Sequence, residues 1–183
     1  MSVRDKTNIN NDNLYFLTFT ILDWQKVFIE KKYIDLVYKW FDYVKDKYSN
    51  KVYGYVVMPN HIHCIMFLSD KSPKLSVLIQ NAKRFMAYGI VKLLTKDGHD
   101  ELLKIFSEKA DIGNNAKHKI FKERYDSQVI ESRKYFLQKL NYIHNNPCYE
   151  KWKLVKNPED YKYSSASNYY LNNGVYYVEL MDF

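Results

Sequence analysis

The chain has 183 residues, a formal net charge of +7 and two cysteines. This length allows one domain with its own hydrophobic core, and an apolar share of 46% argues against general disorder. Two cysteines without CxxC spacing argue against a disulfide framework and fit a cytoplasmic protein. The basic charge favours an anionic partner, such as nucleic acid, an acidic protein or a membrane surface.

The N-terminal residues 1–13 are polar and rich in asparagine, and we expect this segment to be flexible. It lacks the apolar stretch of a signal peptide, and no apolar run in the chain approaches the length of a membrane span. We therefore expect no membrane partner. Residues 14–183 contain no internal repeat or linker, which predicts a single domain.

The first half of the domain alternates strand and helix patterns. Residues 14–22 are dense in aromatic and β-branched side chains and predict a buried strand. Apolar residues at three- and four-residue spacing predict an amphipathic helix over 30–48. Residues 51–58 and 61–68 then predict two short strands that meet at a turn around Pro59.

The next stretch begins with another helix, predicted over 75–94 from its apolar stripe. We expect 97–116 to be an excursion from the core, with a short helix at about 101–109. Residues 119–130 contain strand-like material around a basic turn.

A last long helix is predicted from about Ser132, a candidate cap, to Asn145, because Pro147 disfavours helical angles in the residue before it. Residues 150–183 are expected to wrap over the body of the domain. The order strand, helix, strand, strand, helix, strand, followed by an added C-terminal helix, predicts an α+β fold with a ferredoxin-like (RRM-like) antiparallel sheet. We expect helices on one face of this sheet and an open face for a ligand.

The motif His61-Ile62-His63 opens the second strand of the predicted hairpin. Side chains alternate along a strand, so the two imidazoles point to the same face and can hold a divalent metal ion between them. On its own this is a weak signal, because histidines on a half-buried sheet are more often simply hydrogen-bonded.

The last predicted helix adds Tyr142 and Asn146. Residues i and i+4 share one helical face, so the phenol and the amide stand together. Side by side they offer a nucleophile and an oxygen ligand for a metal. The alternative for Tyr142 is an ordinary core tyrosine.

These motifs together resemble the single-tyrosine HUH transposases, and more closely the REP-associated tyrosine transposases. The resemblance runs from about Leu14 to Ser165 in the order of the family. The matching segments are Met-Pro-Asn-His-Ile-His at 58–63, Phe-Lys-Glu-Arg-Tyr-Asp at 121–126, Tyr-Ile-His-Asn-Asn-Pro at 142–147, and the stretch 152–165 that ends in Pro-Glu-Asp-Tyr-Lys-Tyr-Ser-Ser.

The resemblance implies a role for each residue of the constellation. His61 and His63 would be metal ligands, and Asn146 stands where relatives carry an amide ligand. Tyr142 would be the nucleophile that attacks a DNA phosphodiester, leaving a 5′-phosphotyrosine link and a free 3′-hydroxyl. The implied cofactor is Mg²⁺ or Mn²⁺, which would neutralise the phosphate and position it for in-line attack without ATP.

The implied partner is single-stranded or hairpin DNA. Its bases could stack on aromatic side chains while cations follow the phosphates. The candidate DNA contacts are two residues of the second helix and two of the basic turn: Lys83, Arg84, Lys122 and Arg124. The oligomeric state is open between a monomer and a homodimer.

Two other functions remain to be weighed against a DNA strand transferase. The first is a non-catalytic module that binds single-stranded nucleic acid on an RRM-like sheet. The second is a structural zinc site at His61 and His63, which the absence of a nearby cysteine pair disfavours.

Overall fold

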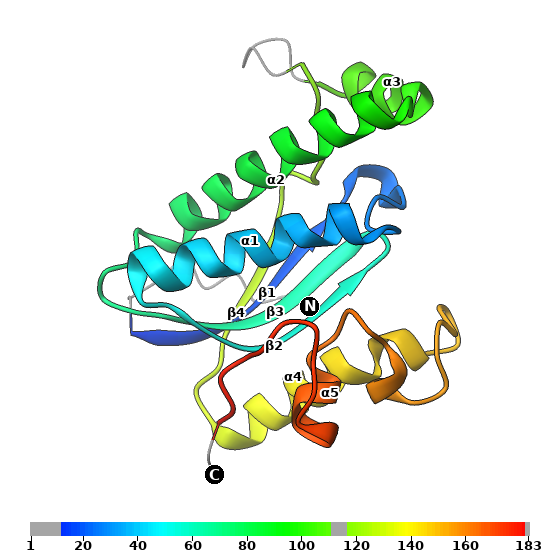
Figure 1. Ribbon diagram of the computed structural model, residues 1–183. Helices are drawn as coiled ribbons and strands as arrows, with labels where there is room; N and C mark the ends of the chain where they lie inside the picture. Colours follow the sequence, from blue (N-terminus) through cyan, green and yellow to red (C-terminus); the bar gives the residue numbers. More distant parts are fainter. Residues whose placement is uncertain (1–11, 111–116, 182–183) are drawn as a thin grey trace.

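A four-stranded antiparallel sheet forms the centre of the computed structural model, which describes residues 12–110 and 117–181 (Figure 1). The strand order is β2-β3-β1-β4. The strands are β1 (Asn13–Thr20), β2 (Lys51–Met58), β3 (His61–Leu68) and β4 (Asp126–Val129). The predicted α+β architecture with an antiparallel sheet is therefore confirmed.

Two long helices cover one face of this sheet, α1 (Lys31–Tyr48) and α2 (Leu75–Asp97) (Figure 1). Their apolar stripes pack against alternate residues of the strands, such as Leu17, Phe19 and Ile62, which are fully buried. This layer is the main hydrophobic core, and it fixes which residues of each strand must face the opposite side.

The short helix α3 (Asp100–Glu108) corrects the prediction that this part of the chain is an excursion. Its Phe106 is fully buried in the main core, and the amide of Lys119 donates to the carbonyl of Phe106 at 2.8 Å. Leu102, Leu103 and Ile105 of the same helix also pack against this core. Residues 111–116, the rest of the expected excursion, lie outside the described residues.

The helix α4 (Arg133–Asn145) lies on the other face of the sheet (Figure 1). The Ser132 hydroxyl accepts a hydrogen bond from the amide of Tyr135, so Ser132 caps this helix as predicted. Phe136 and Ile143 pack in a second core that also contains Phe16 of β1. The sheet face that we expected to be open is thus partly covered.

Gly54 brings α4 close to β2. A Cβ atom at this position would lie 2.7 Å from Cδ1 of Leu140 on α4, a distance that real Cβ contacts do not show. The pairing of β2 with β3 also shifts register between Val52 and Gly54. The missing side chain therefore helps to set how near α4 approaches the sheet.

The segment that follows α4 runs along the edge of the sheet formed by β2. The amide of Ser165 donates to the carbonyl of Tyr55, and the amide of Val57 donates to the carbonyl of Tyr163, both at 2.9 Å. A last helix, α5 (Ala166–Leu171), follows directly. These bonds occupy backbone groups that an exposed edge strand would leave open.

Two predicted strand segments differ from the structure. β1 ends at Thr20, because Asp23 and Trp24 adopt positive φ angles in a short 3-10 helix, Leu22–Trp24. The stretch 119–125 makes only an isolated bridge through Phe121. There the carbonyls of residues 122 and 123 accept hydrogen bonds from a lysine side chain instead of joining a ladder.

Within the described ranges, no helix is both long and apolar enough to span a bilayer. The expectation that the first 13 residues are flexible concerns mainly residues 1–11, which lie outside the described part. Asn13 already belongs to β1.

Candidate functional site

His61 and His63 stand together at the start of β3, on the face of the sheet that carries α4. Their ring centroids are 4.7 Å apart at an interplanar angle of 74°, and each residue is 6% exposed. Directly across on β1, Thr18 pairs with His63 and Thr20 with His61. Strand alternation and register thus bring both imidazoles to one spot.

The Nδ1 atom of each imidazole has a polar neighbour. Asn60 Oδ1 lies 2.7 Å from Nδ1 of His61, and Asn60 Nδ2 donates to the carbonyl of Trp24 at 3.0 Å. Because that second bond fixes the orientation of the amide, Nδ1 of His61 carries the proton and Nε2 keeps its lone pair. Thr18 Oγ1 lies 2.9 Å from Nδ1 of His63 and can accept a hydrogen bond from it in the same way.

Both rings are neutral near neutral pH. Burial lowers the pKa of His61 to about 4, with a further contribution from the charge of Lys151. Burial also drives the pKa of His63 well below its usual range, helped by His61 and by Lys139. A neutral imidazole is the form that binds a metal.

The end of α4 brings Tyr142 and Asn146 to the same place. The Tyr142 ring lies 5.3 Å from the His63 ring and is 40% exposed, whereas Asn146 is 3% exposed. Asn146 lies where it can accept a hydrogen bond from the protonated His61 ring, which opposes the lowering of that ring's pKa. Among the described residues, however, no donor reaches the buried Oδ1 of Asn146 in hydrogen-bonding geometry. Such an orphaned oxygen is costly unless a ligand satisfies it.

These side chains line a hollow of about 440 Å³ between α4 and the sheet. Trp24 and Tyr149 are half-exposed members of its lining, and we refer to this part of the lining as its rim or mouth. The lining comes from β1, β3, β4, α4 and the turns at either end: Phe16, Thr18, Thr20, Trp24, His61, His63, Asp126, Gln128, Lys139, Tyr142, Asn146, Tyr149, Lys151 and Trp152.

Two lysines line this hollow, Lys139 and Lys151, and a third, Lys122, lies beside it over the ring of Trp24. Lys139 Nζ lies 4.6 Å from the centroid of the Phe16 ring, while Lys122 and Lys151 lie 4.1 Å and 5.2 Å from that of Trp24. In the part of the chain that the structure describes, none of the three forms an ion pair. Unpaired cations around a concave site attract an anionic ligand.

The structure separates the residues that we predicted to contact DNA. Lys122 lies at the mouth of the hollow, and Arg124 is exposed two residues later. Lys83 is half-buried, and its ammonium donates to the carbonyls of Lys122 and Glu123 at 2.7 and 2.9 Å. Burial lowers the pKa of Lys83 to about 8.

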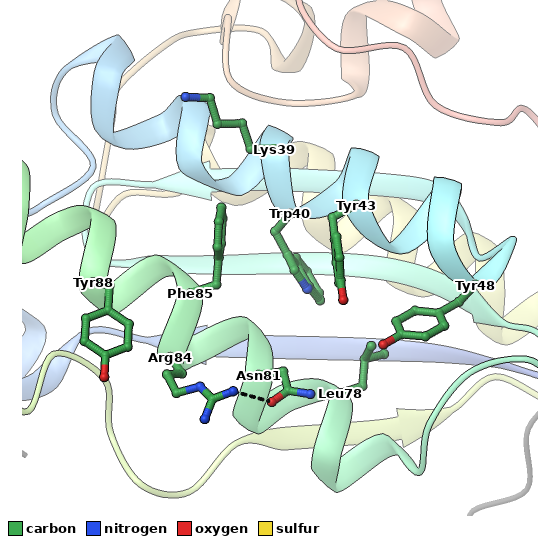
Figure 2. A pocket seen from close by; sticks show the side chains of 9 residues that line it. All are labelled: Lys39, Trp40, Tyr43, Tyr48, Leu78, Asn81, Arg84, Phe85 and Tyr88. Carbon is green, nitrogen blue, oxygen red and sulfur yellow. Dashed lines mark hydrogen bonds between the residues drawn. The ribbon is translucent and has the colours of Figure 1, made fainter.

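Arg84 lies on the opposite face of the sheet. Figure 2 shows it in a groove between α1 and α2, where it donates to Asn81 at 3.5 Å. Aromatic rings such as Tyr43 and Phe85 line the same groove. The sheet and its main core separate Arg84 from the paired histidines.

A second cluster of potential metal ligands lies elsewhere. Single ligand atoms of Glu30, Asp97 and His99 lie within 4.8 Å of one another, a spacing that could hold a metal ion. Lys32 Nζ lies 2.7 Å from Asp97 and 3.1 Å from Glu30. One ammonium therefore already pairs with both carboxylates.

Several residues of the hollow were not singled out from the sequence. Lys139 precedes Tyr142 by three positions, so helical periodicity could have revealed it. Thr18 depends on the register between β1 and β3, and Lys151 and Trp24 come from turns far apart in the chain. No local sequence signal places these three beside the histidines.

Two solved structures resemble this chain, and the first of them shares its fold. A REP-associated tyrosine transposase bound to a REP hairpin matches 100% of this chain and 95% of its own, with a TM-score of 0.66 and 18% identity. A candidate transposase from Deinococcus radiodurans R1 matches 79% of this chain and 97% of its own, with a TM-score of 0.47 and 14% identity. No protein-family model and no curated protein sequence matches. The chain is thus similar over its full length to a tyrosine transposase in fold.

Proposed function

We propose that this protein is an HUH-type tyrosine transposase with a ferredoxin-like sheet, which cleaves and rejoins single-stranded DNA at hairpin-associated sites. The observation that carries the proposal is the convergence of four groups in one basic hollow: two neutral imidazoles, a half-exposed phenol and an unpaired amide oxygen. The shared fold with a tyrosine transposase supports the same assignment.

The residues of the hollow fit a divalent metal ion. His61 and His63 would supply imidazole nitrogens, held by Asn60 and Thr18 as outer-shell partners, and Asn146 would supply its orphaned oxygen. We propose Mn²⁺ or Mg²⁺, of which manganese accepts imidazole ligands more readily. When bound, the metal would neutralise the charge of the scissile phosphate and orient it.

Tyr142 would act as the nucleophile. Its phenol oxygen forms a bond to phosphorus while the bond from phosphorus to the 3′ oxygen breaks. The bonding electron pair stays on the 3′ oxygen, which takes up a proton, and the phenol loses its own. The product is a 5′-phosphotyrosine and a free 3′-hydroxyl. Because the phosphoester bond is conserved in the link to Tyr142, attack by another 3′-hydroxyl rejoins the strand without ATP.

The charge around the hollow fits a DNA strand. Lys139 precedes Tyr142 by about one helical turn, and Lys122 and Lys151 lie at the mouth, so phosphates on either side of the cleaved bond would meet a cation. Arg124 is exposed nearby in the chain and extends this path. Hairpin DNA is the expected partner, by analogy with the REP hairpin bound to the transposase of the same fold.

The alternative of a purely binding, RRM-like module requires a bare sheet on which bases stack. Here α4 covers much of that face, and Phe16 is 5% exposed. The aromatic rings that are exposed enough for a base to stack on, such as Trp24 and Tyr149, lie at the rim of the hollow instead. The geometry therefore favours a strand transferase over a sheet-surface binder.

A covalent-adduct assay tests the proposal. A DNA hairpin with single-stranded tails, labelled at its 3′ end, is incubated with protein and Mn²⁺ and then denatured. We expect the 3′ label to remain attached to protein and a 5′ label to leave on a free fragment, because the link is to the 5′ phosphate. Both products should disappear with chelator. Retained binding without any adduct would favour the binding module.

A further inference from the structure

Trp24 is an exposed tryptophan at the rim of the site. Its side chain is 48% exposed, and its ring lies 6.1 Å from the ring of His61 in an edge arrangement. The chain has three tryptophans. Trp40 is 2% exposed in the main core, and Trp152 is half-buried against His61 at 5.7 Å. Trp24 is therefore the one that offers a large open surface beside the paired histidines.

The backbone holds Trp24 in an unfavourable conformation. Asp23 and Trp24 have φ angles of 50° and 58°, in the left-handed region that costs free energy for residues other than glycine. The side chain of Asn60 fixes this turn, since its Nδ2 donates to the carbonyl of Trp24 while its Oδ1 lies at 2.7 Å from Nδ1 of His61. One amide thus couples the position of Trp24 to that of a candidate metal ligand.

Two lysines converge on the Trp24 ring. Their Nζ atoms lie 4.1 Å (Lys122) and 5.2 Å (Lys151) from its centroid, and neither has a carboxylate partner within the described ranges. Like charges gathered in this way repel one another, and an anion bound between them would relieve the repulsion. Both ammonium groups lie over the exposed ring. An unpaired nucleotide can take their place, because its base stacks on the indole while the long lysine side chains turn from the ring to its phosphate.

We propose that Trp24 is the stacking surface for an unpaired nucleobase next to the scissile phosphate, and that Lys122 and Lys151 bind phosphates of the same strand. This inference rests on the proposed function and adds to it the residue that positions the strand. Stacking beside His61 would fix the backbone of the DNA relative to Tyr142. Cleavage would then require an unpaired base at that point of the strand.

Tryptophan fluorescence gives a direct test, because a base stacked on an indole quenches its emission. The Tyr142→Phe variant, which keeps DNA uncleaved, is titrated with a DNA hairpin carrying single-stranded tails. We expect quenching that is lost when Trp24→Phe is added and kept when Trp152→Phe is added instead. Equal quenching with and without the indole of Trp24 would overturn the inference.

Abasic sites provide a second measurement, one that does not depend on emission. Removing the base at each tail position in turn should reveal one position where the affinity falls about tenfold. Trp24→Leu should lower the affinity for the intact DNA by a similar factor and should abolish the effect of that abasic site. Trp24→Phe should retain part of the effect, because it keeps an aromatic ring.

The outcomes separate this inference from the proposed function. If wild-type protein forms the covalent adduct but Trp24→Leu binds every DNA as tightly as wild type, the stacking surface is wrong and the strand transferase stands. If no adduct forms but the abasic effect depends on Trp24, the stacking surface stands and the chemistry is wrong. Failure to bind any of these DNAs would reject both.

Discussion

At the scale of single residues, Asn60 shows how the site is held together. Its amide contacts both the Trp24 carbonyl and the His61 ring, so the rim and a candidate ligand share one support. The orientation of the amide settles which nitrogen of His61 is protonated. Asn60 is not itself a candidate ligand, but it thus determines which nitrogen of His61 is free to bind a metal.

Lys83 offers a prediction at this scale. Its pKa falls from 10.5 to about 8 because it is buried, so between these values the unfolded chain binds more protons than the folded one. The stability of wild type relative to Lys83→Met should therefore rise as the pH increases from about 8 to about 10. Urea denaturation of both proteins at several pH values measures the difference.

Lys92→Met is the matched control, because it removes an exposed lysine from the same helix. Identical pH profiles for wild type and Lys83→Met would show that the ammonium of Lys83 is well solvated. A solvated ammonium would support the prediction that Lys83 contacts DNA.

Local periodicity explains which site residues the sequence could predict. Alternation along a strand places His61 and His63 on one face, and helical spacing pairs Tyr142 with Asn146. Thr18 could not be found in this way, because its contact with His63 depends on the register between strands distant in sequence.

At the scale of elements, α4 is the part of the fold that completes the site. It carries Tyr142 and is followed directly by Asn146, while the sheet carries both histidines. The distance between α4 and the sheet therefore decides whether the phenol can reach a phosphate held at the imidazoles. The bounds of α4 follow from its cap and from Pro147, but its packing face depends on the second core.

Gly54→Val tests the role of this approach. The added side chain would clash with Leu140, which is 6% exposed, and should push α4 outward. We expect a loss of stability of about 1–3 kcal/mol from overpacking, together with a large loss of adduct formation. Thermal unfolding and the adduct assay measure the two effects.

Gly89→Val provides a control with the same steric change. A Cβ at Gly89 would lie 2.6 Å from Cδ2 of Leu36, at the contact between α1 and α2 on the other face. This variant should lose stability but keep adduct formation at temperatures where it is folded. Equal loss of activity in both variants would mean that the spacing of α4 has no special role.

At the scale of the whole molecule, charge and layers determine where DNA can bind. The unpaired lysines surround the hollow on the α4 face, whereas Arg84 lies in the groove between α1 and α2 (Figures 1 and 2). The order of strands and helices could be predicted from hydrophobic patterns. Which face α4 would cover could not, because that depends on long-range contacts of residues such as Phe16.

Lys139→Gln tests this distribution of charge. Loss of one phosphate contact should weaken binding and reduce the slope of log affinity against log salt concentration by roughly 0.7 for single-stranded DNA. Fluorescence anisotropy at several salt concentrations measures the slope. Arg84→Gln should leave it unchanged, and an equal change in both variants would place DNA on both faces of the sheet.

The most direct measurement of the central claim compares two tyrosines that line the same hollow. Tyr142 and Tyr149 are 40% and 45% exposed, with ring centroids 6.2 Å apart. In the denaturing adduct assay with 3′-labelled hairpin DNA and Mn²⁺, Tyr142→Phe should form no covalent product while still binding DNA. Tyr149→Phe should form the product as wild type does. A covalent product from Tyr142→Phe would contradict the assignment of Tyr142 as the nucleophile.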